Sequence, residues 1–255
     1  MILAIDIGNT HTDLGLGNLD RITRVAQVRT QDWRKPNGLA RVESFVGRRK
    51  LKGIAISSVV PDITPRVMAA LEKRFGVSCV CLSNRNVVGL GIDYPKPQSI
   101  GADRLANAMA ALQRFGAPVV VVDFGTAVTF DVVDKSGQYV GGIIAPGLSA
   151  MTDYLHEKTA LLPKVKIRDS KRTIGKSTRE AMLIGAVKGY RGLISNLISE
   201  LKTDLEVRRL KVIATGGYAR LMAKELPQVT HVEPRLTLEG LRLLALDCFN
   251  LSKSG

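Results

Sequence analysis

The sequence predicts an α/β protein made of two similar domains. Apolar, strand-like segments alternate with helix-like segments along the 255 residues, which is typical of layered α/β folds. In addition, residues 2–16 (ILAIDIGNTHTDLGL) and 119–133 (VVVVDFGTAVTFDVV) follow the same plan. Such self-similarity indicates duplication of a domain. We therefore expect one domain at 1–116 and another at 117–255, with a ligand-binding cleft between them.

Each copy of the repeat begins with an apolar strand that reaches an aspartate, turns at a glycine and enters a second strand. A third strand follows in both copies, as TRVAQV and as YVGGIIA. An ungapped superposition gives the equivalent pairs Asp6 and Asp123, Gly8 and Gly125, Asn9 and Thr126, and Thr12 and Thr129.

The other elements follow in order. KGIAISSVVP (52–61) has the continuous apolar character of a buried strand, residues 64–75 are helical, and 77–82 form a further strand. A strong helix opens at Gly101 and is stopped by Gly116 and Pro118. In the second half we expect helices near 147–159 and 176–202, a strand at 210–215, and a final helix capped by Thr237.

Composition excludes several classes of function. The 37 Lys and Arg residues exceed the 23 acids, giving a net charge of +14, which suits nucleic acid, a membrane surface or anionic substrates. Aromatic residues are only 5% of the chain, so base-stacking platforms are not evident. We expect neither nucleic acid nor a membrane as partner. Three cysteines without metal or disulfide spacing, and no signal-like N-terminal segment, predict a cytoplasmic protein with buried free thiols.

The turn Asp6-Ile-Gly-Asn-Thr is the first candidate site. Its glycine permits a sharp backbone turn, and the N–H groups that follow can cradle phosphate oxygens. Asp6 is an oxygen ligand suited to Mg²⁺, directly or through water. A plain β-hairpin is the alternative, because Asn and Gly are common turn residues. The second turn, led by Asp123, has the same design, and this repetition favours phosphate binding. Neither GxGxxG nor a P-loop sequence is present.

Gly101-Ala-Asp-Arg is the second candidate site. Asp103 could accept the proton of an attacking hydroxyl, and Arg104 could bind a carboxylate. The alternative is an ordinary helix start with an acid matched to the helix dipole. Gly216-Gly217 would allow close approach of an adenine or ribose, or simply form a tight turn. Ser177 or Thr178 could cap the next helix.

Together these segments resemble the type III pantothenate kinases, in that family's order and from residue 2 to about residue 245. The matching segments are Asp6-Ile-Gly-Asn-Thr, Ser58-Val-Val-Pro61, Gly91-Ile-Asp-Tyr94 with Pro97, Ile100-Gly-Ala-Asp-Arg104, Asp123-Phe-Gly-Thr-Ala-Val-Thr129, Gly141-Gly-Ile-Ile-Ala-Pro-Gly147, Ile174-Gly-Lys-Ser-Thr178, Gly185 with Gly189-Tyr190, and Thr215-Gly-Gly217. The chain departs from the family at Asp13, where an apolar strand residue is expected, and at His11, where Asn is common.

The resemblance implies a duplicated RNase H-like fold of the actin-like ATPases and a homodimer. It implies ATP-dependent phosphorylation of pantothenate to 4'-phosphopantothenate, the first step of coenzyme A biosynthesis, with Mg²⁺ and a monovalent cation, K⁺ or NH₄⁺. Asp103 would be the catalytic proton acceptor, Asp123 would bind the monovalent cation and Asp6 the Mg²⁺. The residues implied to bind ATP are Asp6, Ile7, Gly8, Asn9, Thr10, His11, Thr12, Asp13 and Thr126. The residues implied to bind pantothenate are Tyr94, Gly101, Ala102, Asp103, Arg104 and Thr178, the last contributed across the dimer.

Two other functions remain open at this point. The family has relatives described as Bvg accessory factors and linked to transcription, so a regulatory role is one. DNA binding driven by the positive charge is the other. Asp6, Asp103, Arg104 and Asp123 together favour the enzyme, because a regulatory binding protein has no use for a general base.

Overall fold

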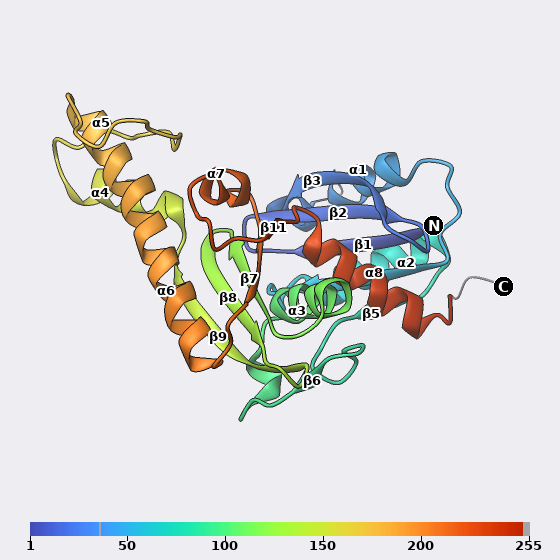
Figure 1. The fold of residues 1–255 in the computed structure, drawn as a ribbon. Coiled ribbons are helices and arrows are strands. Elements are labelled where there is room, and N and C mark those ends of the chain that lie inside the picture. The colour runs from blue at the N-terminus through green and yellow to red at the C-terminus, as the bar shows by residue number, and fades with distance from the viewer. Residues whose placement is uncertain (36, 252–255) are drawn as a thin grey trace. The chain divides into compact units, whose positions relative to one another are not determined.

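The computed structural model describes residues 1–35 and 37–251, which form two compact α/β units (Figure 1). The first unit comprises Met1–Arg114 and Arg235–Gly255, and the second comprises Phe115–Pro234. In the described part of the chain, no helix combines the length and apolar character that crossing a membrane requires.

The first unit is built on a sheet with strand order β3-β2-β1-β4-β5. The first three strands are antiparallel, and β4 and β5 then run parallel to β1. Its strands are β1 (Ile2–Ile7), β2 (His11–Gly17), β3 (Ile22–Arg29), β4 (Gly53–Ser58) and β5 (Cys79–Cys81). The short β6 (Gly91–Ile92) follows in the chain but is not part of this sheet. Its helices are η1 (Thr30–Arg34), α1 (Asn37–Val46), α2 (Thr64–Phe75), η2 (Pro97–Ser99), α3 (Ala102–Phe115) and α8 (Leu236–Cys248).

The second unit repeats this plan, with strands in the order β9-β8-β7-β10-β11. Here too three antiparallel strands are followed by two parallel ones. The strands are β7 (Val119–Phe124), β8 (Ala127–Val133), β9 (Gln138–Pro146), β10 (Lys211–Thr215) and β11 (His231–Val232). The helices are α4 (Leu148–Lys158), α5 (Thr178–Ile184), a π-helical turn η3 (Gly185–Gly189), α6 (Tyr190–Asp204) and α7 (Ala219–Ala223). The duplication predicted from the sequence repeat is thereby confirmed, as is the duplicated RNase H-like fold that the family resemblance implies.

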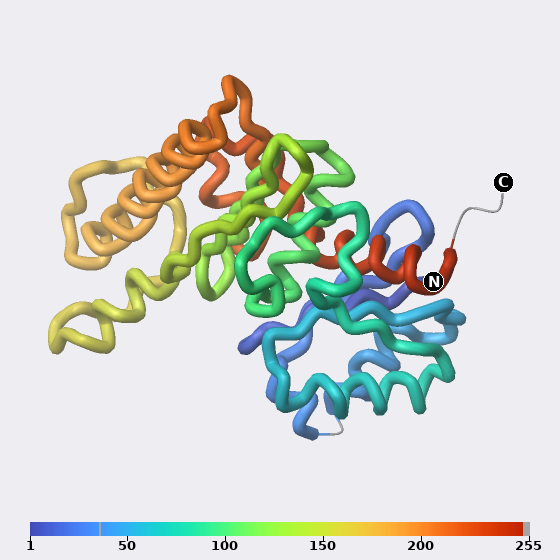
Figure 2. The backbone as a smooth tube through the Cα atoms, turned by 90° about the horizontal axis from the view of Figure 1, so that it is seen from below, coloured from blue at the N-terminus to red at the C-terminus, as the bar shows by residue number. Residues whose placement is uncertain are grey.

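Alternation along β1 explains how the first sheet is covered on both faces. Leu3, Ile5 and Ile7 point into a buried cluster with residues of α1 and α2. The opposite face is covered by α8, which lies along these strands in Figure 2 (red). Gly15, Gly17 and Gly53 leave room for it. A Cβ atom at these positions would press on the side chains of Leu238, Arg242 and Phe249, respectively.

The position of α8 differs from the expected division at 116/117, which assigned this helix to the second domain. The helix packs on β1, β2 and β4 of the first unit. Its start also differs from expectation. The N-cap is Arg235 without a side-chain cap, whereas the hydroxyl of Thr237 donates to Oδ1 of Asn107 on α3 at 2.8 Å. A long-range bond to α3 thus replaces the local cap.

In the second unit, one face of the sheet packs against α6 (Figure 1). Val120, Val122 and Phe124 of β7 share a buried cluster with Tyr190 and Ile194 of this helix. The hydroxyl of Tyr190 donates to the carbonyl of Pro146 at the end of β9, at 2.8 Å. The core therefore fixes the ends of β7 and β9 relative to one another, and both ends carry candidate site residues.

Candidate active site

The first aspartate-led turn joins β1 to β2. The N–H of Gly8 donates to the carbonyl of His11 at 3.0 Å, which closes the turn over Asn9 and Thr10. A Cβ atom at residue 8 would lie 3.0 Å from that same carbonyl, so the close approach favours glycine. Asn9, Thr10 and His11 are exposed. The turn therefore presents polar groups to solvent at the carboxyl end of β1.

Four polar side chains form a row across the first sheet beside this turn. Asp13 pairs directly with Asp6 in the antiparallel register, and Ser57 and Gln27 continue the row on the outer sides. Direct partners across strands share a face of the sheet. The hydroxyl of Ser57 donates to Oδ1 of Asp6, and Nε2 of Gln27 donates to Oδ1 of Asp13 at 2.8 Å. The two carboxylates are thus held on one face by neutral donors on either side.

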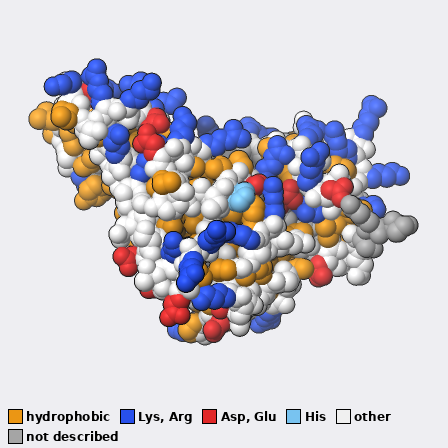
Figure 3. Space-filling model, in the orientation of Figure 1, with side chains coloured by type: hydrophobic (Ala, Val, Ile, Leu, Met, Phe, Trp, Pro, Cys, Tyr) orange, Lys and Arg blue, Asp and Glu red, His pale blue; other side chains and the backbone are white. Residues whose placement is uncertain are grey.

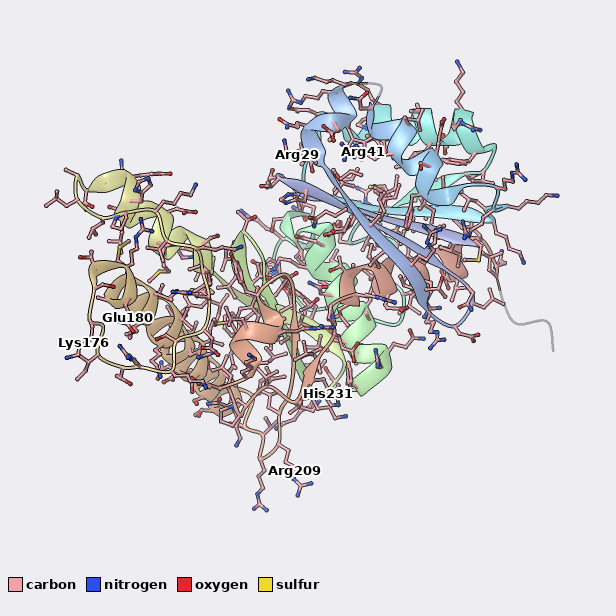
Figure 4. All side chains as sticks on the ribbon, turned by 90° about the horizontal axis from the view of Figure 1, so that it is seen from above. Arg29, Arg41, Lys176, Glu180, Arg209 and His231 are labelled. Atoms are coloured by element: carbon pink, nitrogen blue, oxygen red, sulfur yellow. The ribbon has the colours of Figure 1, made fainter. Side chains whose placement is uncertain are left out.

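Burial raises the pKa of Asp13, while the hydrogen bond from Gln27 and the charge of His11 act in the lowering direction. His11 pairs with Arg29, and both lie on this face one step closer to the turn (Arg29 is labelled in Figure 4). On this face of the sheet, the basic side chains of His11 and Arg29 therefore lie next to the exposed turn, and the two carboxylates lie farther from it.

The donor set of Asp6 and Asp13 fits a hard divalent cation. Mg²⁺ is usually held by one or two carboxylates together with phosphate oxygens of the substrate. Among the described residues there is no group of three or more His, Cys, Asp and Glu side chains that could hold a metal alone.

The second aspartate-led turn joins β7 to β8 and is one residue shorter than the first. The N–H of Gly125 donates to the carbonyl of Ala127, two residues further along, at 3.1 Å. Asp123 pairs with Thr129 across the two strands. The ungapped superposition of Thr129 on Thr12 is therefore wrong beyond the turn. By register, Thr129 is the counterpart of Asp13, so the second unit carries a hydroxyl where the first carries a carboxylate.

Other turns of the second unit close around Asp123. Gly216, with φ of +86°, follows β10, and a Cβ atom there would clash with Oδ1 of Asp123. Gly147 donates its N–H to the carbonyl of Thr126 at 3.1 Å, and a Cβ atom there would clash with that carbonyl. The predicted residues Asp123 and Thr126 thus lie with Gly147 and Gly216 at the carboxyl ends of neighbouring strands.

Asp103 and Arg104 lie in the first turn of α3, after Gly101, and both are half-buried. Oδ1 of Asp103 accepts from the N–H of Arg104 at 2.9 Å. The helix is held by α8, since a Cβ atom on Gly240 would clash with the backbone of Ala106. The same α8 covers the face of the sheet that carries Asp6, so α8 links the two candidate sites of the first unit.

The remaining predicted residues lie elsewhere. Thr178 is the exposed first residue of α5, and the cap is the preceding Ser177, whose hydroxyl accepts from the N–H of Glu180 at 3.2 Å. The carboxylate of Glu180 accepts in turn from the N–H of Lys176 at 2.8 Å, at the end of the unit that Figure 4 labels with these two residues. Tyr94 lies in the loop between β6 and η2.

The sequence argument missed Ser57 and Gln27. Ser57 could have been found, because it ends a buried strand parallel to β1, and the carboxyl ends of parallel strands meet at one edge. No local signal marks Gln27, whose importance depends on the strand register.

Comparison with known proteins identifies the family of the chain. The family model described as type III pantothenate kinase matches residues 2–200. A type III pantothenate kinase of Akkermansia muciniphila is 50% identical over 189 residues, covering 74% of this chain and 78% of that protein. Another, from Methylacidiphilum infernorum, is 41% identical over 244 residues, covering 95% of this chain and 87% of that protein.

Solved structures share the fold at low identity. A Campylobacter jejuni protein described as a Baf family transcriptional activator has a TM-score of 0.63 at 19% identity, covering 98% of this chain and all (100%) of that one. A Listeria monocytogenes protein described as an N-acetylmannosamine kinase has a TM-score of 0.50 at 12% identity, with 96% and 98% covered.

The repeated sheet has the fold of the actin-like ATPases, and the family match makes the chain an ATP-dependent phosphotransferase. Within that class the matches are specific. The chain belongs to the type III pantothenate kinase family.

Proposed function

We propose that this chain phosphorylates the hydroxyl of pantothenate with ATP and that Asp103 is the general base of the reaction. The product is 4'-phosphopantothenate, the first intermediate on the route to coenzyme A. The observation that carries the proposal is the family match over residues 2–200, together with the retention of Asp6, Asp103, Arg104 and Asp123. A protein that only bound a ligand would have no need of this set of charged residues.

The position of Asp103 supports a role in proton transfer. It is half-buried at the start of α3, on a rigid element fixed by α8, and not on a mobile loop. Phosphoryl transfer depends mainly on positioning and on compensation of charge. In our proposal Asp103 accepts the hydroxyl proton while the guanidinium of Arg104 binds the carboxylate of pantothenate. Gly101 and Ala102 shape the backbone on which these groups approach the substrate.

The turn from Asp6 to Asp13 binds the phosphates of ATP in this proposal. The backbone and side chains of Asn9, Thr10 and His11 are exposed at the turn, which suits an anion. Asp6 and Asp13 would hold Mg²⁺, which would supply positive charge to the γ-phosphate. Asp13 is thereby assigned a role that an apolar residue at this position could not fill.

The second unit contributes Thr126 to the nucleotide and Asp123 to a monovalent cation, K⁺ or NH₄⁺. Support comes from the close packing of Gly147 and Gly216 around these residues. Small residues at this place allow a ligand to approach the backbone. The hydroxyl of Thr129, at the place where Asp13 lies in the first unit, fits a singly charged cation better than a second carboxylate would.

We further propose that the active protein is a homodimer in which Thr178 and Tyr94 contact pantothenate. Large hydrophobic side chains are exposed near the end of β9, along α4, in the loop after it and on α6, and Figure 3 shows orange side chains gathered at this end of the second unit. These exposed residues are Ile144, Met151, Tyr154, Leu161, Ile174 and Leu193. Such a patch commonly marks a protein interface. The same region holds Thr178, so a partner subunit seated there would bring it to a substrate.

The positive charge and the free cysteines fit this reading. Lys and Arg side chains are spread over the face shown in Figure 3 and do not form one stripe, and Arg209 extends outward in Figure 4. A distributed positive field attracts ATP without specifying nucleic acid. Free Cys79, Cys81 and Cys248 agree with a reducing cytoplasm.

A coupled ADP-release assay with pantothenate, ATP and Mg²⁺, with and without K⁺, tests the function. We expect ADP release that requires pantothenate and increases with K⁺. Asp103→Asn should keep the fold and lose about 10²- to 10⁴-fold in kcat, because a general base contributes about that much. Asp62→Asn, at an exposed position of the same unit, is the control. Near-normal turnover by Asp103→Asn would refute the role of Asp103, whereas turnover without pantothenate would indicate another acceptor.

A further inference from the structure

A chain of three hydrogen bonds connects Trp33 on η1 to the turn after β1. Nε1 of Trp33 donates to Oγ1 of Thr12 at 3.1 Å. Oγ1 of Thr12 and Oγ1 of Thr30 are 3.1 Å apart, and Oγ1 of Thr30 donates to the carbonyl of Gly8 at 2.6 Å. This series of hydrogen bonds therefore runs from the indole of Trp33 to a backbone carbonyl of the candidate phosphate-binding turn.

The chemistry of the two ends fixes the direction of every bond. The indole N–H of Trp33 can only donate, and the carbonyl of Gly8 can only accept. Thr30 uses its single hydroxyl proton on Gly8, so the hydroxyl of Thr12 must donate to Thr30. All three bonds consequently point the same way, an arrangement in which each bond strengthens the next.

The surroundings hold this chain in place. Thr12 is fully buried and Thr30 is 4% exposed, so water does not compete for their hydroxyl groups. The backbone N–H of Thr30 also donates to the carbonyl of Thr10 at 3.1 Å, giving this residue two bonds to the turn. At the other end, α1 packs tightly on η1, because a Cβ atom on Gly38 would lie 2.9 Å from Cα of Trp33.

The bond from Thr30 determines which way one peptide group of the turn faces. In a planar trans peptide, the C=O and the following N–H point in opposite directions. Thr30 holds the carbonyl of Gly8, so the N–H of Asn9 faces away from Thr30. Glycine makes such a peptide easy to rotate, and a rotated peptide would present its carbonyl, which repels phosphate.

We propose that Thr30 is a positioning residue, supported by Thr12 and Trp33, that keeps the N–H of Asn9 directed at the nucleotide phosphates. The proposal rests on the proposed function of this turn. It assigns to the end of β3 and to η1 a part in ATP binding, although Thr30 itself touches only the protein.

Thr30→Val and Thr30→Ser form a matched pair for the test. Valine keeps the shape of the side chain but cannot donate to Gly8, whereas serine keeps the donor. Binding of ATP with Mg²⁺ is measured by isothermal titration calorimetry, and the KM values for ATP and for pantothenate are measured alongside. We expect Thr30→Val to raise Kd and KM for ATP about ten-fold, which matches the loss of one buried hydrogen bond, with KM for pantothenate unchanged. Thr30→Ser should restore ATP binding to within about two-fold of the wild-type protein.

Trp33→Phe provides a second test at the other end of the chain. It removes the indole N–H from a half-buried side chain, and thermal unfolding without ATP reports whether each variant folds. We expect the same selective rise in Kd for ATP, but smaller, about two- to five-fold, because the bond from Thr30 to Gly8 remains.

The outcomes separate this inference from the proposed function. Equal Kd values for ATP in the wild-type protein, Thr30→Val and Thr30→Ser would overturn the positioning role. Equal rises in KM for ATP and for pantothenate would also overturn it, because a general structural defect would affect both substrates. If the wild-type protein did not bind ATP at all, that result would refute the proposed function of the turn itself, whatever the variants showed.

Discussion

Gly216 at the end of β10 lies against the carboxylate of Asp123 at the end of β7. The backbone of Gly216 has a φ of +86°, a left-handed value that residues with a side chain rarely adopt. A Cβ atom at this place would also clash with Oδ1 of Asp123 and with the backbone of Phe124. This glycine therefore serves both the turn after β10 and the space that Asp123 needs.

Gly216→Ala should consequently destabilise the protein and displace Asp123. Left-handed backbone costs alanine about 1–2 kcal/mol, and the clash adds to this cost. Gly217→Ala is the matched control, because a Cβ atom at 217 meets nothing within 4 Å. Urea unfolding should show a free energy of unfolding lower by at least about 1–2 kcal/mol for Gly216→Ala and little change for Gly217→Ala. Equal losses in both variants would show that Asp123 does not impose the requirement.

The repeat shows how far the sequence could predict the fold. Apolar strands that end in Asp and Gly revealed the duplication, because the strand pattern and the turn residues are local properties. The ungapped superposition nevertheless misplaced Thr129, since the turn before it is one residue shorter. Strand register depends on which carbonyl the glycine N–H reaches, His11 in one unit and Ala127 in the other, and sequence spacing does not record that choice.

The position of α8 was less predictable for a similar reason. Chain order suggested that it belongs with the second half. Its contacts instead depend on Gly15, Gly17 and Gly53, which leave space on the first sheet for its side chains. In the sequence, none of the three glycines is distinguished from an ordinary strand residue. Only the assembled sheet brings the three together under one helix. The candidate site was hard to predict for the same reason, because only the strand register places Ser57 and Gln27 beside Asp6 and Asp13.

Arg191 and Asp169 provide a prediction for pH dependence. The guanidinium of Arg191 is 5% exposed and donates from Nη1 to Asp169 at 3.1 Å and to Glu225 at 2.7 Å, and from Nη2 to the carbonyl of Leu221 at 2.7 Å. It therefore fastens the loop that precedes Thr178 to α6 and α7. The hydrogen bond from Arg191, with its charge, lowers the pKa of Asp169 below its ordinary value of 3.8.

A carboxyl group whose pKa is lower in the folded state than in the unfolded state stabilises the protein at pH values above its unfolded-state pKa. That stabilisation is lost as the pH falls through the folded-state pKa. Asp169→Asn should therefore lower the free energy of unfolding by about 1 kcal/mol at pH 7, a modest amount because the carboxylate is partly exposed. The loss should be smaller at about pH 3, below the ordinary pKa of 3.8, and should vanish once the pH has fallen through the lowered folded-state pKa. Urea unfolding at the two pH values measures it. A loss of the same size at both would exclude the charge interaction.

The cysteines differ in their expected reactivity. Sequence reasoning predicted buried thiols, but Cys248 is exposed, and Cys79 and Cys81 are half-buried. Burial, with the nearby charge of Glu72, raises the pKa of Cys79 to about 12 from 9.0. Its reactive thiolate is then about a thousand-fold scarcer than that of a free thiol. At pH 8, iodoacetamide should modify Cys248 first and Cys79 last, as followed by mass spectrometry. Prior modification of Cys79 would contradict this order.

The opposed carboxylates of Asp6 and Asp13 support the last prediction. Like charges directly opposite across two strands destabilise a sheet, by about 0.2–1 kcal/mol. Asp13→Asn removes one charge while its Oδ1 can still accept from Gln27. Without divalent metal, the variant should therefore be more stable than the wild-type protein by about that amount at pH 7. The exposed Asp62→Asn, which removes a charge from the same unit, serves as the control.

Metal should reverse that order, because a cation between the two carboxylates turns their repulsion into binding. Addition of Mg²⁺ with ATP should raise the Tm of the wild-type protein and of Asp62→Asn by similar amounts, and that of Asp13→Asn by less. The shift follows from ligand binding to the folded state alone, so a weaker Mg²⁺ affinity gives a smaller shift. Repeating the titration with ATP in EDTA separates the metal from the nucleotide. If Mg²⁺ raised the Tm of Asp13→Asn as much as that of the wild-type protein, Asp13 would not be part of the metal site. Its carboxylate would then only destabilise the sheet.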